Sequence, residues 1–135
     1  MHKVLVVGCG GSGAKTLAYM MDQLKTTLAE RLPERYDSPK DVDLPRAWQF
    51  VSVDVPTVAE RPGKNLANVP EAGGRYISCG SSDRYATVDT AVSNQLASRG
   101  ELGTIASWAL ENPAAEPTPI SAGAGQYRSI GRMLF

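Results

Sequence analysis

Histidine and cysteine are scarce in this sequence. Its 135 residues include one histidine and two cysteines. His2 stands beside the first residue, so no Ser/His/Asp catalytic set can be built on it. Cys9 and Cys79 are too few for a disulfide framework, and no C-x-x-C pair is present to ligate zinc. We therefore expect free thiols and no metal site built from cysteine or histidine.

Net charge and long apolar runs are also missing. Lysine and arginine together number 14, as do aspartate and glutamate, so the formal net charge is zero. Nucleic-acid-binding modules usually carry a basic excess, which disfavours that class. No apolar run approaches the ~18 residues of a membrane span, and the few apolar residues after Lys3 are too short for a secretory signal. We therefore expect a cytoplasmic chain with no nucleic-acid or membrane partner.

The first third of the chain has the pattern of a strand, a helix and a second strand. Val4–Val7 is a continuous apolar run, which is typical of a strand buried on both faces of a parallel sheet. A helix is predicted over 13–31 by apolar residues on one stripe: Leu17, Met20, Met21, Leu24 and Leu28. A second apolar run predicts a strand over 48–53, which ends before Asp54. This order favours an α/β fold with a Rossmann-like parallel sheet.

Periodicity is weaker in the rest of the chain. Residues 56–82 are rich in glycine, proline, asparagine and serine, and they predict no regular element. Apolar spacing predicts helices near 86–98 and 101–111, and a further helix that begins after Gly125. Two predicted strands make a small sheet, and the last helix is short. We therefore expect the chain to be the N-terminal part of a longer protein, incomplete at its C-terminus.

A glycine-rich segment joins the first predicted strand to the first predicted helix. Four glycines occur in the six positions from Gly8 to Gly13. Glycine lets a backbone approach a phosphate closely, and the first N–H groups of a helix are unpaired and lie at the positive end of its dipole. The segment therefore indicates a phosphate-binding site. The alternative is a tight turn that only packs the helix close to the strand.

Two common nucleotide motifs fit this segment incompletely. The dinucleotide pattern G-x-G-x-x-G is present, and its ribose-binding acid is expected about 20 residues later. The acid available here is Asp54, which lies 41 residues after Gly13. A Walker loop is excluded because the extra Ala14 turns Lys15 by about 100° around the helix, so that Lys15 is expected to be solvated. A Rossmann-type NAD- or adenylate-binding enzyme stays an alternative.

Three segments in order along the chain resemble the nucleotide loops of tubulin-like GTPases, especially the divergent bacterial tubulin-like proteins. GCGGSGAK at 8–15 resembles their glycine-rich first loop. VDVPTV at 53–58 resembles tubulin VDLEPTV, and SAGAGQYRSIGRM at 121–133 resembles tubulin QSGAGNNWAKGHY. Each segment is short, but their common order makes the likeness specific. The chain is therefore similar to the N-terminal part of a tubulin-type GTPase domain.

This resemblance implies a site for GTP or GDP built from successive loops. The α- and β-phosphates would face a first loop that contains Gly10, Gly11, Ser12 and Gly13. Asp54 would lie near the phosphates and a magnesium ion. The γ-phosphate would be sensed by a loop that contains Ala124, Gly125 and Gln126. The resemblance also implies that the full-length protein is a GTPase that self-associates into polymers.

The sequence departs from the family pattern in three respects. The glutamate of VDLEPTV is missing after Asp54, and the glycine- and threonine-rich fourth loop, GGGTG[ST]G, is not found in these residues. The interval between the second and third segments is long. We therefore expect a single nucleotide-binding domain over 1–135 with an insertion around 59–120, and we assign no catalytic residue. A non-catalytic interaction domain that keeps only the fold is a further alternative.

Overall fold

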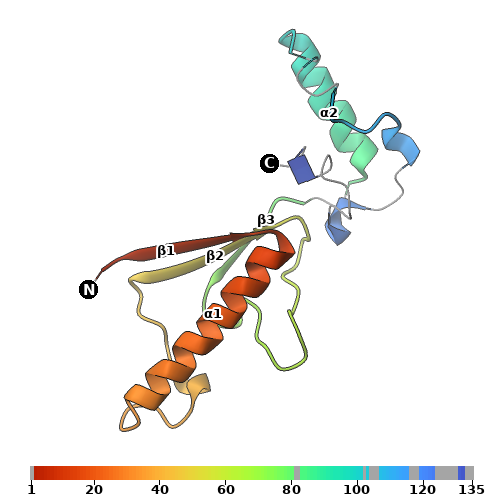
Figure 1. The fold of residues 1–135 in the computed structure, drawn as a ribbon. Coiled ribbons are helices and arrows are strands. Elements are labelled where there is room, and N and C mark those ends of the chain that lie inside the picture. The colour runs from red at the N-terminus through yellow and green to blue at the C-terminus, as the bar shows by residue number, and fades with distance from the viewer. Residues whose placement is uncertain are drawn as a thin grey trace. The chain divides into compact units, whose positions relative to one another are not determined.

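The computed structural model describes residues 2–80, 83–101, 103, 107–115, 119–123 and 131–132. The chain divides into two compact units, the first formed by residues 1–54 and 58–78 and the second by 55–57 and 79–135. The main elements are β1 (Val4–Cys9), α1 (Gly10–Arg31), β2 (Trp48–Asp54) and β3 (Arg75–Ser78) in the first unit, and α2 (Tyr85–Ser98) in the second (Figure 1).

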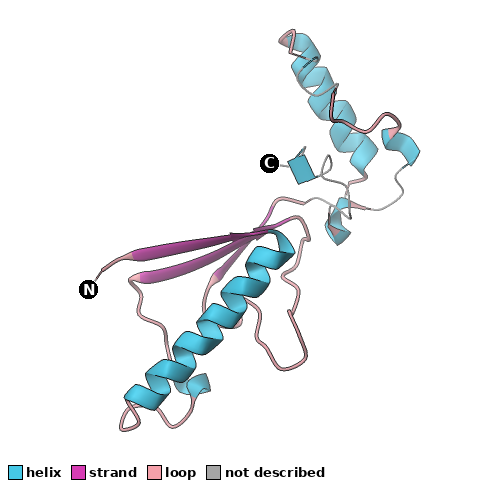
Figure 2. Cartoon of the chain, in the orientation of Figure 1, coloured by secondary structure: helices cyan, strands magenta, loops and turns pink. Residues whose placement is uncertain are grey.

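The first unit contains a parallel sheet with the strand order β1-β2-β3. Gly8 lies opposite Ser52, and Val53 lies opposite Ile77. Parallel neighbours need a crossover connection, and α1 provides it between β1 and β2 while packing on one face of the sheet (Figure 2). This arrangement confirms the predicted α/β fold with a Rossmann-like parallel sheet.

α1 packs on the sheet through one apolar stripe. The buried cluster of this unit consists of Leu17, Ala18, Met21, Phe50, Val69 and Ala72. Met20, which was predicted to share the stripe, is 39% exposed. Adjacent residues lie about 100° apart around a helix, so Met20 turns toward solvent when Met21 faces the sheet. The predicted stripe is therefore correct for Leu17 and Met21 and wrong for Met20.

The opposite face of the sheet is exposed on its two outer strands, β1 and β3. Side chains alternate between the two faces of a strand, and α1 covers the face that carries Val6 and Phe50. The other face carries Leu5, Val7 and Ile77, which are 66%, 52% and 51% exposed. The prediction that the first strand is buried on both faces is therefore wrong in the structure described.

No loop separates β1 from α1. β1 runs to Cys9 and α1 begins at Gly10, so the helix starts three residues before the predicted residue 13. A Cβ on Gly8 would lie 2.5 Å from the carbonyl oxygen of Gly13, and a Cβ on Gly13 would lie 2.7 Å from the carbonyl carbon of Gly8. Real Cβ atoms do not come so close to other atoms. These two glycines therefore let the helix start directly against the end of the strand.

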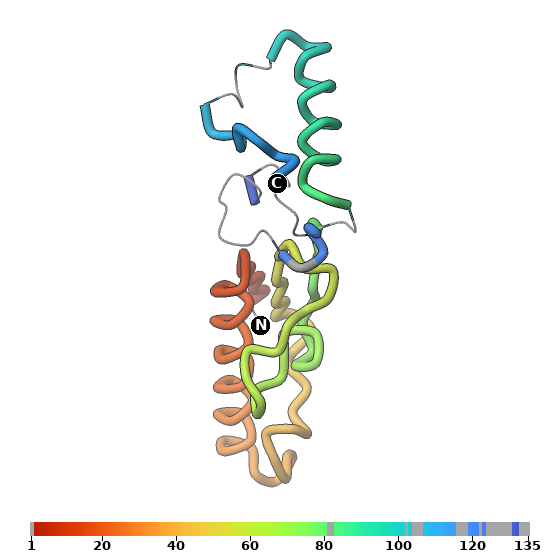
Figure 3. Tube along the Cα trace, turned by 90° about the vertical axis from the view of Figure 1, so that its right-hand side faces the viewer, coloured from red at the N-terminus to blue at the C-terminus, as the bar shows by residue number. Residues whose placement is uncertain are grey.

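A long segment joins β2 to β3 and runs alongside α1 (Figure 3). One helical turn within it is closed by a 2.9 Å hydrogen bond from the N–H of Ala72 to the carbonyl of Asn68. The turn ends at Gly73, whose φ of 103° favours glycine. β3 follows, and the sequence did not predict it because four residues give too short a pattern. β3 falls within the predicted insertion at 59–120, whose extent stays a prediction.

The second unit contains α2, which begins at Tyr85, one residue before its predicted start. The Tyr85 side chain is buried in a cluster with Val55 and Ile120. The N–H of Thr57 donates to the carbonyl of Ser121 at 3.3 Å. The short segment after β2 is therefore tied to the segment near residue 120.

The helix predicted over 101–111 lies only partly within the described residues. Residues 107–111 form turns and bends, so the prediction is wrong there. Pro113 follows closely, and the conformation that proline imposes on its predecessor disfavours a continuing helix. Gly131 and Arg132 are helical, in the region where the last helix was predicted. Among the described residues, no helix is long and apolar enough to cross a membrane.

Replacing Gly13 by alanine should destabilise the protein. The added Cβ would press against the backbone of Gly8, and overpacking typically costs about 1–3 kcal/mol. Gly63→Ala is the matched control, because a Cβ there would meet no described atom within 4 Å. Urea unfolding of both variants measures the difference. Equal stability of the two variants would contradict the close contact between β1 and α1.

Candidate functional site

The first turn of α1 lies at the edge of the sheet where β1 ends (Figure 1). Gly10, Gly11, Ser12 and Gly13 all belong to this turn. The side chain of Cys9 at the N-cap position makes no capping hydrogen bond, and the turn contains no acidic residue. The first N–H groups of a helix lack partners within the helix and lie at the positive end of its dipole. The four predicted phosphate-binding residues therefore occupy one uncapped helix start.

The backbone of this turn is open to a ligand at Gly11. Among the described residues, a Cβ on Gly11 would have one neighbour within 4 Å, the Oδ2 atom of Asp54 at 3.8 Å. Gly10 has a φ of 69°, and a Cβ there would meet none of the described atoms within 4 Å. These two glycines thus differ from Gly8 and Gly13, whose missing side chains serve packing. Asp54 lies in front of the open turn, and its role at a phosphate site stays a prediction.

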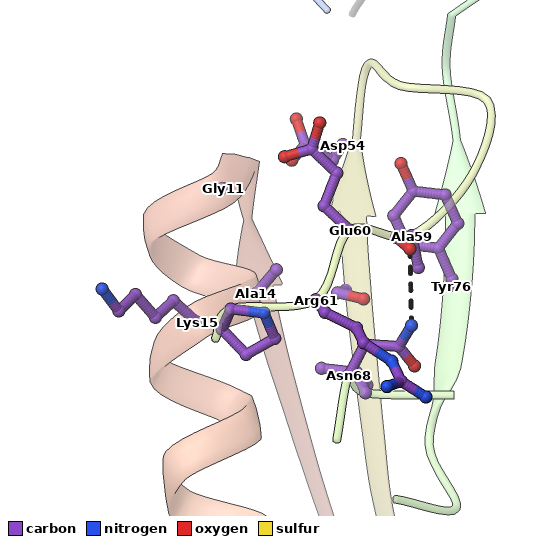
Figure 4. Close-up of a pocket in the computed structure, with 12 residues that line it drawn as sticks. Gly11, Ala14, Lys15, Asp54, Ala59, Glu60, Arg61, Asn68 and Tyr76 are labelled. Carbon is purple, nitrogen blue, oxygen red and sulfur yellow. Dashed lines mark hydrogen bonds between the residues drawn. The ribbon is translucent and has the colours of Figure 1, made fainter. Parts of the chain in front are cut away.

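A cavity of about 320 Å³ opens beside the start of α1 (Figure 4). Cavities of roughly 300–1,000 Å³ are typical of small-molecule sites. Its walls come from α1, from both β2 and β3, and from the segment after β2, and its lining is Gly11, Ala14, Lys15, Ser52, Asp54, Ala59, Glu60, Arg61, Pro62, Asn68, Val69 and Tyr76. Asp54 and Ser52 share one face of β2 because they lie two residues apart. The structure therefore places Gly11 and Asp54 at the same cavity.

Two residues near the cavity test the Walker-like interpretation of the glycine segment. The hydroxyl of Thr16 donates to the carbonyl of Ser12 at 2.9 Å within the helix. Lys15 is not buried, and Figure 4 shows its side chain pointing away from the cavity. These positions agree with the prediction that Lys15 is a solvated helix lysine. The segment therefore does not form a Walker loop.

Glu60 brings a second carboxylate to the cavity beside Asp54. Both residues line it, and Figure 4 draws both carboxylates at the end where α1 begins. The sequence reasoning missed Glu60, because it lies six residues after Asp54 and no motif marks it. Among the described residues, no group of three or more histidine, cysteine, aspartate or glutamate side chains is placed to hold a metal ion. Any ion at this end would therefore need further ligands.

The outer wall of the cavity is held together by Arg61, Asn68 and Glu71. The carboxylate of Glu71 accepts hydrogen bonds at Oε1 from Nε and Nη2 of Arg61, at 3.0 and 2.7 Å. Its Oε2 accepts the N–H of Asn68 at 3.1 Å, while Oδ1 of Asn68 accepts the N–H of Glu71 at 2.9 Å. This reciprocal pair is a capping box. The N-x-x-E spacing of Asn68 and Glu71 was the sequence signal that could have revealed it.

The ion pair between Arg61 and Glu71 shifts the pKa of both side chains. The hydrogen bond from Arg61 is the main cause that lowers the pKa of Glu71, and the N–H of Asn68 adds to the effect. The pKa of Arg61 is raised, chiefly by its hydrogen bond to Glu71. The exposed fractions of the two side chains are 64% and 38%. Solvent therefore screens the pair, which stays ionised at neutral pH.

The structure describes only part of the third predicted segment. Ala124, Gly125 and Gln126 lie outside the described residues, so their role stays a prediction. The structure describes the residues just before them, where a short 3-10 turn at Ile120–Ala122 ends at Gly123 with a φ of 112°.

Cys9 is exposed at the start of α1, and Cys79 is half-buried.

Replacing Arg61 by glutamine should raise the pKa of Glu71 toward its ordinary value. Because the pKa of Glu71 is lowered in the folded protein, its ionised carboxylate stabilises the fold at pH values above its unfolded pKa. This stabilisation is lost as the pH falls through the folded pKa. Carboxyl NMR titration measures the shift directly. Lys64→Gln removes a charge from the same segment without removing the hydrogen bond and should leave Glu71 unchanged. The same titration curve for Glu71 in wild type and Arg61→Gln would contradict the ion pair.

Comparison with known proteins identifies the family of the chain. No significant match was found among curated proteins or among solved structures. A family model described as tubulin-like matches residues 5–135. The match covers α1, β2 and all but the first residue of β1, and it confirms the resemblance of the chain to tubulin-like proteins. Because this match covers nearly the whole sequence, the chain belongs to the tubulin-like family.

Proposed function

We propose that this protein binds a guanine nucleotide, GTP or GDP, with its phosphates at the start of α1. The observation that carries the proposal is the uncapped first turn, where Gly11 faces open space in front of Asp54. A phosphate at this position would accept hydrogen bonds from the backbone N–H groups. Membership of the tubulin-like family supports guanine as the base.

The proposed site would also hold a magnesium ion at the same end of the cavity. Magnesium is usually held by one or two carboxylates together with phosphate oxygens and water. Asp54 and Glu60 would supply the carboxylates, since both line the cavity near Gly11. Glu60 would then take the place of the glutamate that is missing from the VDLEPTV-like segment. The ion would neutralise part of the phosphate charge next to these two acids.

The activity of the full-length protein is a further part of the proposal. Ala124, Gly125 and Gln126 would meet the γ-phosphate, as the likeness of their segment to the third tubulin loop implies. Self-association and GTP hydrolysis would follow from the same family membership. No residue of this chain is assigned to the hydrolytic step.

One observation favours a second candidate, a Rossmann-type NAD-binding or adenylate-binding enzyme. Asp54 ends β2 beside the glycine-rich turn, which is where a dinucleotide-binding fold carries its ribose-binding acid. In that case Asp54 would bind a ribose hydroxyl and no magnesium would be needed there. An interaction domain that keeps only the fold would bind neither nucleotide.

GTP and GDP should bind to the full-length protein in preference to NAD. The reason is that the cavity presents two carboxylates for a metal–phosphate complex at the end where α1 begins. Calorimetric titration with each ligand, with and without magnesium, compares the candidates. Tight NAD binding without a guanine-nucleotide signal would select the Rossmann-type alternative. The absence of binding for all three ligands would select the interaction domain.

Gly11→Val should abolish nucleotide binding by the full-length protein while leaving it folded. The valine side chain would occupy the open space between α1 and Asp54, where a Cβ has a single described neighbour within 4 Å. Gly63→Val adds the same atoms at a position where a Cβ would meet no described atom within 4 Å, and it should bind normally. Calorimetry together with thermal melting measures both effects. Unchanged GTP affinity in Gly11→Val would rule out the start of α1 as the phosphate site.

A further inference from the structure

Arg61 is the cation of the outer cavity wall. It follows Glu60 directly, and both residues line the cavity. Only the Nε and Nη2 side of the guanidinium faces Glu71, so among the described residues the Nη1 donors are left for another partner. The other cation of the lining, Lys15, points away from the cavity in Figure 4. Figure 4 draws the Arg61 guanidinium beside Asn68 and away from Asp54 and Glu60, so Arg61 is the cation of the lining that can meet an anion inside the cavity once its side chain turns inward.

The negative charges that line the cavity favour a cation nearby. Asp54 and Glu60 both present carboxylates at the end where α1 begins. An incoming phosphate chain would add more negative charge at that end, and like charges repel strongly where water is partly excluded. A guanidinium matches the planar, two-pronged geometry of phosphate oxygens. Balancing the charge with Arg61 would reduce the repulsion.

We propose that Arg61 is a phosphate-binding residue of this cavity, and that it leaves Glu71 for the phosphates when the nucleotide enters. The proposal rests on the proposed nucleotide site and adds to it a residue from outside the three family-like segments. In the structure, Glu71 holds the Arg61 guanidinium at the rim. After the exchange, Glu71 still caps the turn at Asn68 through its Oε2 atom.

The exchange is energetically feasible because the ion pair that it breaks is weak. Exposed ion pairs contribute about 0–1 kcal/mol in most measurements, and the Arg61 side chain is 64% exposed. Hydrogen bonds between ionised groups are roughly twice as strong as neutral ones, and arginine–phosphate pairs are frequently bidentate. Glu71 itself is fixed by the capping box with Asn68, so the wall keeps its shape when Arg61 moves. The guanidinium therefore moves without unfolding the segment.

Two matched variants of the full-length protein separate phosphate binding from a structural role. Arg61→Gln and Glu71→Gln both remove the ion pair, but only the first removes the cation. Glutamine at 71 can still cap the turn, because capping boxes accept glutamine as well as glutamate. Calorimetry with magnesium–GTP measures affinity, and thermal melting verifies that each variant is folded. Lys64→Gln controls for the loss of one positive charge in the same segment.

The proposal predicts that Arg61→Gln weakens GTP binding by about tenfold, which corresponds to about 1.4 kcal/mol. Glu71→Gln should bind as tightly as wild type or more tightly, because it no longer competes for the guanidinium. Equal losses in the two variants would overturn the proposal in favour of a structural ion pair, and so would an unchanged affinity in Arg61→Gln. If wild type binds GTP and Gly11→Val does not, the nucleotide site at the start of α1 stays supported even when the Arg61 proposal fails. If wild type binds no GTP, both proposals fail.

Discussion

The contact between Gly8 and Gly13 is the constraint on which the site depends. Each glycine occupies the space that a Cβ of the other would need, so the first turn of α1 lies directly on the end of β1. A side chain at either position would push the helix away from the strand. The helix would then begin farther from Asp54 and from the cavity that Gly11 lines. Gly8 and Gly13 thus serve packing, whereas Gly10 and Gly11 in the same short segment leave space for a ligand.

The cavity illustrates how a parallel sheet gathers distant residues at one edge. The strands end together, and residues from the segment after β2 join α1 and the strands around one cavity. Ser52 is 1% exposed, and its hydroxyl donates to the carbonyl of Arg75 at 3.3 Å, which joins β2 to β3 beside the cavity. Gly74 allows the preceding turn to lie close to β2, because a Cβ there would stand 2.8 Å from the carbonyl oxygen of Phe50.

The two faces of the sheet are covered to different extents. α1, Val69 and Ala72 bury the face that carries Phe50 and contribute the main core of the first unit. Leu5, Val7 and Ile77 remain exposed on the other face. Continuous apolarity in β1 correctly indicated a strand of a parallel sheet, but it could not report how much of the opposite face is covered by the described residues. Apolar patterning records which residues can be buried, whereas coverage depends on the packing of separate elements.

The sequence alone determined β1, α1 and β2, the position of Asp54 at the end of β2, and the family of the chain. These features are local, since each follows from a run of apolar residues, a spacing of glycines or a short motif. Tertiary structure decided the rest. β3 is too short to have a periodic signal, and Glu60, Arg61 and Asn68 reach the cavity only because their segment packs against α1. Side chains brought together by packing leave no fixed spacing in a sequence, so their shared site became visible only in the fold.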